Sequence, residues 1–414
     1  MRNDYYIEFT KEMKKEYTVL IPNMLPLHFE LISHVMKTYG YQTELLDNQG
    51  PQIAQTGLKY VHNDTCYPAI LVIGQFIDAI KSGKYDPHKV ALIYFQTGGG
   101  CRASNYISLL RKALKKAGYG YVPVISFSFA GLEKHSGFKL SIPFVVKALI
   151  AIIYGDLLMS LENQCRPYEI NAGESTALAH RFAYEISQKL STLGVSNKPM
   201  KAQFLEVLDA FKAIPKHGEK KIQVGVVGEI YVKFSPLGNN HLVDFLVQEG
   251  AEVQMPGLLD FFLYTLYNSI VDHGVYASKR VIYPVIKIAW NYMSKKQRTM
   301  INIIQDHGEF EAPTLITHTI SLAESFIGMS TKMGEGWLLP AEMLELYDKG
   351  VKNIVCTQPF GCLPNHICGK GMMKPLKDRH PDINIVAIDY DAGATQVNQE
   401  NRIRLMLTAA KERG

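Results

Sequence analysis

The residues of this 414-residue chain that are best suited to chemistry are its cysteines. Cys66 occurs in HNDTCYPAI, Cys101 in QTGGGCRAS and Cys356 in NIVCTQPFGC, each at a turn after a predicted strand or at a strand's end. Thiolates supplied by separate loops are the usual ligands of iron–sulfur clusters, whereas zinc sites normally contain a closely spaced CxxC pair, which this sequence lacks. The pattern favours an iron–sulfur cluster over zinc, and cysteines that simply fill the core are the commoner alternative.

The elements that would position these thiols alternate between short β-rich runs and segments of helical length. This alternation predicts an α/β fold with parallel sheets that are covered by helices on both faces. The segment Ala213–Lys220 combines proline, glycine and charge, so we expect two doubly wound domains with extra helices, residues 1–215 and 216–414. The predicted strands are Tyr17–Ile21, Gln42–Leu46, Lys59–Val61, Val90–Phe95, Val122–Ser126, Ile222–Gly228, Ala251–Gln254, Asn353–Cys356 and Ile383–Ile388.

In such a fold, ligands bind in the crevice outside the carboxyl ends of the strands. We therefore expect Cys66, Cys101 and Cys356 to converge there, with Cys362 only six residues beyond Cys356. The glycines of QTGGGCR resemble a phosphate cradle, but neither a GK[ST] ending nor a GxGxxG pattern is present. Three glycines would equally let the backbone approach an inorganic group. Glu229, after the strand-end Gly228, is interpreted as part of a tight turn.

Composition limits the remaining functions. The chain is 47% hydrophobic and carries a net charge of +5, without a dense Lys/Arg stripe, so nucleic-acid binding is not expected. Charged residues near the N-terminus argue against a signal peptide, and cysteines in a large chain of this kind are expected as free thiols rather than disulfides. The apolar run Ile142–Leu161 contains Lys147 and Asp156, which favours a buried or interface helix, with membrane-surface contact as the alternative.

Several long blocks resemble the C-terminal, dehydratase-subunit-like region of the 2-hydroxyglutaryl-CoA dehydratase activator-related proteins. More distantly, the plan is similar to the subunits of 2-hydroxyacyl-CoA dehydratases and benzoyl-CoA reductase and to the double-cubane cluster protein. The resemblance extends from about residue 17 to residue 409. The blocks are HNDTCYPAILVIGQFIDAIKSGKYD, QTGGGCRASNYISLLRKAL, VGEIYVKFSPLGNN, MGEGWLLPAEM, VCTQPFGCLPNHICGKGM and AIDYDAGATQVNQENRIRLML.

The resemblance implies a [4Fe–4S] cluster between the two α/β halves. Cys66, Cys101 and Cys356 match the family's ligand positions, and Cys362 matches a fourth. Cys165 and Cys368 occupy positions where no family cysteine is expected, although six thiols would suit an [8Fe–9S] double cubane.

The resemblance also implies a cytoplasmic, oxygen-sensitive reductase or dehydratase (lyase) component of anaerobic metabolism, acting by single-electron transfer. Its substrate would be an acyl-CoA, an ester lipid or a small molecule, with membrane contact only if the substrate is a lipid. The sequence has no actin-like phosphate motif, so electrons would come from a separate ATP-hydrolysing activase with its own iron–sulfur cluster. A homodimer or heteromer is implied. The alternative from another class is a cluster-free scaffold or binding module of the same fold.

Polar residues that flank the cysteines are the candidates for catalysis. Arg102 and Lys370 could stabilise a reduced cluster or an anionic substrate, and Glu335, in GEGW, could move a proton. His366 lies four residues after Cys362. Each of these residues could instead cap a loop or carry a surface charge. The predicted catalytic set is Arg102, Glu335 and His366.

Overall fold

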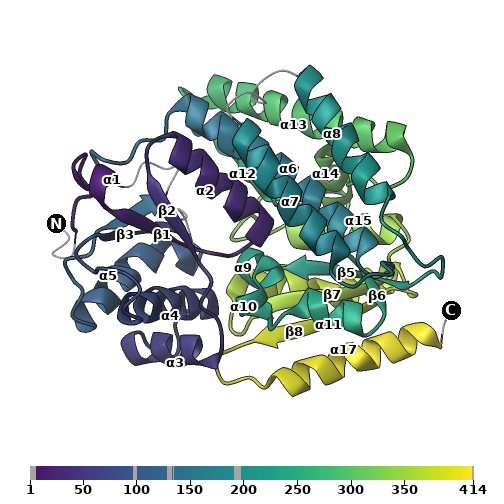
Figure 1. Cartoon of the computed structure of the whole chain (residues 1–414). Coiled ribbons are helices and arrows are strands. Elements are labelled where there is room, and N and C mark those ends of the chain that lie inside the picture. The colour runs from purple at the N-terminus through teal and green to yellow at the C-terminus, as the bar shows by residue number, and fades with distance from the viewer. Residues whose placement is uncertain (1–5, 97–99, 128–132, 134, 191–196, 413–414) are drawn as a thin grey trace.

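The computed structural model describes residues 6–96, 100–127, 133, 135–190 and 197–412, and these form two four-stranded parallel sheets (Figure 1). The first sheet has the order β2-β1-β3-β4 and the second has the order β6-β5-β7-β8, so both follow one doubly wound pattern. The predicted α/β fold with two parallel sheets is confirmed. The strands are β1 (Thr18–Pro22), β2 (Gln42–Leu46), β3 (Val90–Phe95), β4 (Val124–Phe127), β5 (Ile222–Gly228), β6 (Ala251–Gln254), β7 (Asn353–Pro359) and β8 (Asn384–Tyr390).

Helices cover both faces of the first sheet because alternate side chains of each strand point to opposite faces. Val19 and Ile21 of β1 face the core shared with α2 (Pro26–Thr38) and α6 (Ile142–Cys165). Leu20, between them, faces the core formed with the helices on the other side. Those helices are α3 (Pro51–Tyr60), α4 (Tyr67–Lys81) and α5 (Tyr106–Lys116).

The predicted strand Lys59–Val61 is wrong, because its first two residues end helix α3. Pro51 occupies the first turn of this helix, and Ile53, Gly57 and Tyr60 form its buried face. A Cβ on Gly57 would lie 2.1 Å from the carbonyl oxygen of Ile70 in α4. This glycine therefore allows the backbones of α3 and α4 to pack directly against each other. The three residues Lys59–Val61, read alone, gave no sign of this helix contact.

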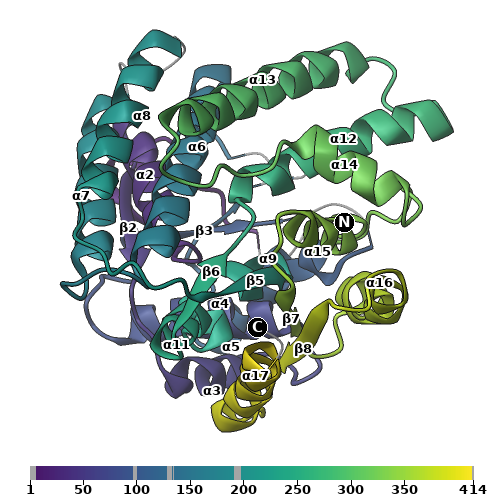
Figure 2. The same cartoon turned by 90° about the vertical axis from the view of Figure 1, so that its right-hand side faces the viewer.

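The second sheet is covered by α9 (Ile230–Phe234), α10 (Pro236–Asn239), α11 (Leu242–Gln248), α15 (Leu338–Asp348), α16 (Met373–Arg379) and α17 (Gln396–Lys411). Figure 2 shows α12 (Leu258–Tyr276), α13 (Tyr283–His307) and α14 (Ile316–Glu324) as a helical layer at the top of the molecule. Helices α7 (Glu174–Lys189) and α8 (Asn197–Lys212) lie at its left, and α7 packs against α2 and α6. Helix α13 packs against α8, and α12 packs against α6. The predicted domain boundary at 215 and 216 falls between α8 and β5, while one hydrophobic core continues across it.

Helix α6 is long and apolar enough to cross a membrane, but 67% of its most hydrophobic window is buried inside the protein, as in the core helix of a soluble α/β protein. Its internal charge has a local role. The carboxylate of Asp156 accepts hydrogen bonds from the backbone N–H groups of Leu258 and Leu259, at 2.7 and 2.9 Å, and pairs with His28 Nε2 at 2.7 Å. Asp156 therefore caps the N-terminus of α12 and links it to α2 and α6.

Candidate functional site

Three cysteines from three different turns meet at the boundary between the two halves. Cys66 precedes the first residue of α4, Cys101 precedes the short 3₁₀ helix η1 (Arg102–Asn105), and Cys362 follows β7. The thiol of Cys66 is close enough to interact electrostatically with those of both Cys101 and Cys362. This is the convergence that parallel strands produce at their carboxyl ends.

The two halves also touch directly beside these thiols. The backbone N–H of Gly100 donates to the sulfur of Met333 at 3.4 Å, which joins the loop after β3 to the loop before α15. Residues 97–99, which include two of the three glycines of the predicted cradle, lie outside the described residues. Arg102 donates from Nη1 to the backbone oxygen of Asp64 at 2.6 Å, so it joins the Cys101 segment to the Cys66 loop.

A pair of stacked tyrosines supports the first thiol. The hydroxyl of Tyr106 donates to the sulfur of Cys66 at 3.1 Å. Its ring stacks on that of Tyr94, with ring centroids 5.5 Å apart. Burial raises the pKa of Cys66 to about 12 and also raises the pKa values of Cys101 and Cys362. Without a metal these thiols are therefore protonated at neutral pH, and ligation would release their protons.

Two carboxyl groups, the buried Glu335 and the half-buried Glu229, lie near the thiols. Glu229 follows β5 and accepts a hydrogen bond from the backbone N–H of Val232, which caps α9. Glu335 accepts from the backbone N–H of Ile230 at 3.0 Å. Burial and repulsion by Glu335 raise the pKa of Glu229 to about 8, and burial also raises the pKa of Glu335. Both carboxyls interact electrostatically with Cys101 and Cys362, so they can hold protons beside the thiols.

The third thiol is held by the segment that follows it. Asn365 Nδ2 is 3.4 Å from the sulfur of Cys362 and 3.1 Å from Oε2 of Glu335. Asn365 starts the π-helical turn η2 (Asn365–Gly369), a rare geometry that is frequent at functional sites. His366 Nδ1 donates to the backbone oxygen of Cys362 at 2.9 Å, which orients the turn rather than the sulfur. Lys370 pairs with Asp389 at 3.2 Å.

Cys356 lies inside β7, which continues to Pro359 instead of ending at Cys356 as predicted, and it has Glu335 as an electrostatic neighbour in common with Cys101 and Cys362. Side chains alternate along a strand, and Cys356 faces the apolar core that contains Met343 and Leu376. Its sulfur lies 3.2 Å from the position that a Cβ on Gly369 would take.

The last two cysteines are also buried, and Cys368 lies in the turn that follows Cys362, with Glu335 as an electrostatic neighbour. Cys165 ends α6, where its sulfur lies 3.8 Å from both the carbonyl oxygen of Phe211 and Nζ of Lys216. Cys368 is buried within η2.

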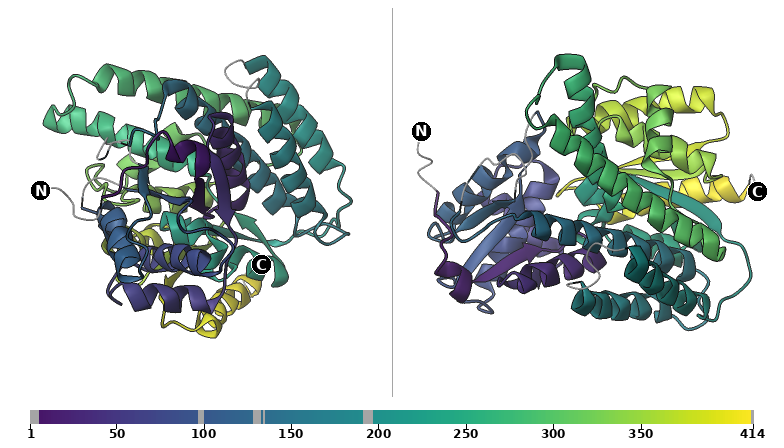
Figure 3. Two further views of the ribbon diagram at one scale, coloured as in Figure 1. Left: turned by 60° about the vertical axis from the view of Figure 1, so that its left-hand side comes forward. Right: turned by 90° about the horizontal axis from the view of Figure 1, so that it is seen from above.

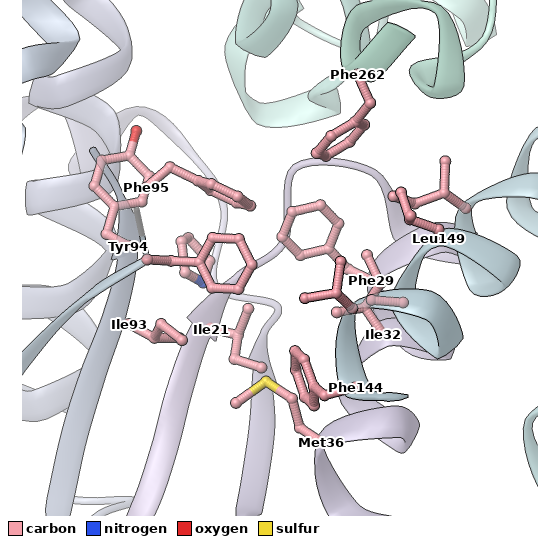
Figure 4. A pocket seen from close by; sticks show the side chains of 15 residues that line it. Ile21, Phe29, Ile32, Met36, Ile93, Tyr94, Phe95, Phe144, Leu149 and Phe262 are labelled. Carbon is pink, nitrogen blue, oxygen red and sulfur yellow. The ribbon is translucent and has the colours of Figure 1, made fainter. Parts of the chain in front are cut away.

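An apolar pocket opens beside the carboxyl ends of the first sheet's strands (Figure 4). It encloses about 740 Å³, including space open to solvent, and its walls are aliphatic and aromatic side chains. Figure 4 shows Phe95 and Phe29 pointing into the space, with Phe262 of α12 above them. Tyr94 borders this pocket, but its ring lies on the opposite face of β3 from Ile93, in the stack that supports Cys66.

The donor set suits a cluster better than a single ion. Within the described residues, no set of three or more His, Cys, Asp or Glu side chains is compact enough to hold one metal ion. The thiolates of a cubane bind different irons, so they are spaced more widely than the ligands of one ion. Three half-buried thiols, two of which accept hydrogen bonds at sulfur, fit such a group.

Comparison with protein-family models and with curated proteins finds no match for this chain. The predicted family membership therefore stays a prediction, and the argument for function depends on the site itself. Sequence reasoning missed Tyr106 and the role of Glu229. The signal for Glu229 was present, because an acidic residue directly after the apolar strand IQVGVVG must lie at the carboxyl edge of the sheet.

Proposed function

We propose that this chain is the iron–sulfur component of a low-potential reductase or dehydratase system, with Cys66, Cys101 and Cys362 as the ligands of a [4Fe–4S] cluster. The observation that carries the proposal is the approach of these three half-buried thiols to one another between the two halves. This ligand set replaces Cys356 of the predicted set, because Cys356 lies in a separate apolar core.

Three protein thiolates leave one iron of a cubane free for substrate, and a low-potential cluster of this kind supplies single electrons to a bound carbonyl. The protein's own contribution is orientation and tuning. Tyr106 and Asn365 donate hydrogen bonds to the sulfurs of Cys66 and Cys362, which stabilises negative charge on those atoms. Arg102 and His366, predicted as catalytic, act here as positioning residues for the Cys101 and Cys362 turns.

The carboxyl pair supplies the proton chemistry. Burial and repulsion by Glu335 raise the pKa of Glu229 to about 8, so Glu229 holds a proton near neutral pH, and burial also raises the pKa of Glu335. Nδ2 of Asn365 donates both to Oε2 of Glu335 and to the sulfur of Cys362. A proton on the Glu335 carboxyl is therefore adjacent to the proposed site of reaction. Delivery of that proton to a reduced carbonyl or a departing hydroxyl is the role we assign to Glu335.

The pocket favours an acyl substrate over a small inorganic molecule. Its aliphatic and aromatic walls suit a hydrocarbon chain, and it lies at the carboxyl ends of β1 and β3, the edge from which the Cys101 loop begins. We therefore propose an acyl thioester or acyl ester as the substrate class. A separate ATP-hydrolysing activase in the cytoplasm would supply the electrons, because this chain carries no ATP-binding motif of that type.

Cysteine variants test the ligand set. We expect Cys66→Ser, Cys101→Ser and Cys362→Ser each to lose most iron and visible absorbance after anaerobic reconstitution, because each removes one of only three thiolates. Cys356→Ala and Cys165→Ala are the matched controls and should keep the wild-type iron content. If folded Cys356→Ala lost as much iron as Cys66→Ser, the proposed ligand set would be wrong.

A further inference from the structure

Exposed apolar side chains gather where α12 joins α13. This connection lies at the edge of the helical layer, away from both sheets (Figure 2 and Figure 3). Val281 is 92% exposed, and five neighbours on the same hairpin are at least half exposed, which is unusual for so many large apolar side chains in one short segment. The six residues, called the hairpin tip below, are Val275, Tyr276, Val281, Ile282, Val285 and Ile288.

The hairpin tip has a defined structure. His273 Nδ1 donates to the backbone oxygen of Ser278 at 2.8 Å, and its ring stacks on Tyr283 with centroids 3.7 Å apart. The turn places Ala277 and Lys279 in the left-handed region, at φ values of 51° and 55°. Such conformations are unfavourable for residues other than glycine and persist only where the surrounding contacts require them. These contacts fix the apolar side chains of the tip in an outward position.

The charged residues within the hairpin are positive, while Asp272, just before it, pairs with Lys332. Residues 273–305 contain six Lys or Arg residues and no Asp or Glu, although acidic and basic residues are nearly balanced over the whole chain. Lys279, Arg280 and Lys287 lie among the apolar residues of the tip and are exposed. Lys296, by contrast, is buried and donates to Asn197 at 2.6 Å, so it contributes to packing rather than to this surface.

We propose that the hairpin tip docks onto an anionic lipid bilayer. Aliphatic side chains that project from a convex end, with cations among them, can enter the headgroup region while the cations pair with lipid phosphates. A second copy of this chain is a poorer partner, because it would bring the same positive charge to the contact. An acidic protein would complement the positive charge of the tip, but a projecting tip offers a protein surface little apolar contact area. The proposal does not depend on the iron–sulfur function.

Co-sedimentation of the full chain with vesicles tests this docking. We expect binding to vesicles of equal parts phosphatidylglycerol and phosphatidylcholine, and much weaker binding to phosphatidylcholine alone. Replacing Lys279, Arg280 and Lys287 with Gln should weaken binding by about five-fold per cation removed. Val281→Ser combined with Val285→Ser and Ile288→Ser should also weaken it. The matched control is Val397→Ser with Leu405→Ser, which changes equally exposed residues of α17 and should leave binding unchanged.

Two outcomes would overturn the proposal. The first is a wild-type protein that does not bind the phosphatidylglycerol vesicles, or binds them as well after the serine substitutions in the tip. The second is self-association of the wild type, measured by light scattering, that disappears in the tip variant while vesicle binding is absent. That result would make the tip an interface between copies of the chain.

Discussion

At the scale of single residues, the hydrogen bonds to two sulfur atoms matter most for the proposed chemistry. Cys66 accepts a hydrogen bond from Tyr106, and Cys362 is contacted by the Asn365 amide. Hydrogen bonds to cluster sulfurs stabilise the reduced, more negative state and so raise the reduction potential. These two side chains would therefore set the reduction potential at which the site donates its electron.

Removing one of these hydrogen bonds should change the potential in a defined direction. In Tyr106→Phe, the loss of a bond worth about 0.5–1.5 kcal/mol should lower the midpoint potential by roughly 20–60 mV. An EPR-monitored redox titration measures this shift. Tyr94→Phe is the matched control, because Tyr94 stacks on Tyr106 and has no hydrogen bond to the sulfur among the described contacts. An unchanged or higher potential in Tyr106→Phe would contradict the assigned role.

At the scale of elements, the helices and strands that could be predicted are those with a clear pattern of hydrophobic residues. The apolar strands β3 and β5 are found with the residues that were predicted for them, because continuous apolar runs bounded by turns are typical of buried parallel strands. Helix α3 was missed because glycine and polar residues dilute its pattern, and its buried face is defined only by α4. The ligand role of Cys356 was predicted on the assumption that its strand ends at Cys356, whereas β7 ends three residues later, at Pro359.

The close contact of α3 and α4 gives a stability test. In Gly57→Ala, a Cβ 2.1 Å from the backbone oxygen of Ile70 forces the helices apart, and we expect a loss of about 1–3 kcal/mol in the free energy of unfolding. Gly274→Ala in α12 is the matched control. Its Cβ would meet nothing within 4 Å, so it should leave stability unchanged or raise it by up to about 1 kcal/mol. Urea unfolding midpoints measure both effects, and equal stabilities would show that the helices are not in backbone contact.

At the scale of the whole molecule, two halves of the same strand order face one another across the thiols. The first half contributes Cys66 and Cys101, and the second contributes Cys362 with both carboxyls. Sequence could predict that thiols after parallel strands converge, since topology dictates this. It could not predict which face of β7 Cys356 takes, nor that Glu229 and Glu335 lie together, because these depend on strand ends and on packing between distant segments.

The most direct test of the central claim is the iron and acid-labile sulfide content of the full chain, purified and reconstituted without oxygen, with EPR before and after reduction. The account predicts about four irons and four sulfides per chain and a reduced-state signal of a [4Fe–4S] cluster. A folded protein that retains essentially no iron after reconstitution would contradict the claim and would leave three half-buried thiols that serve only in packing.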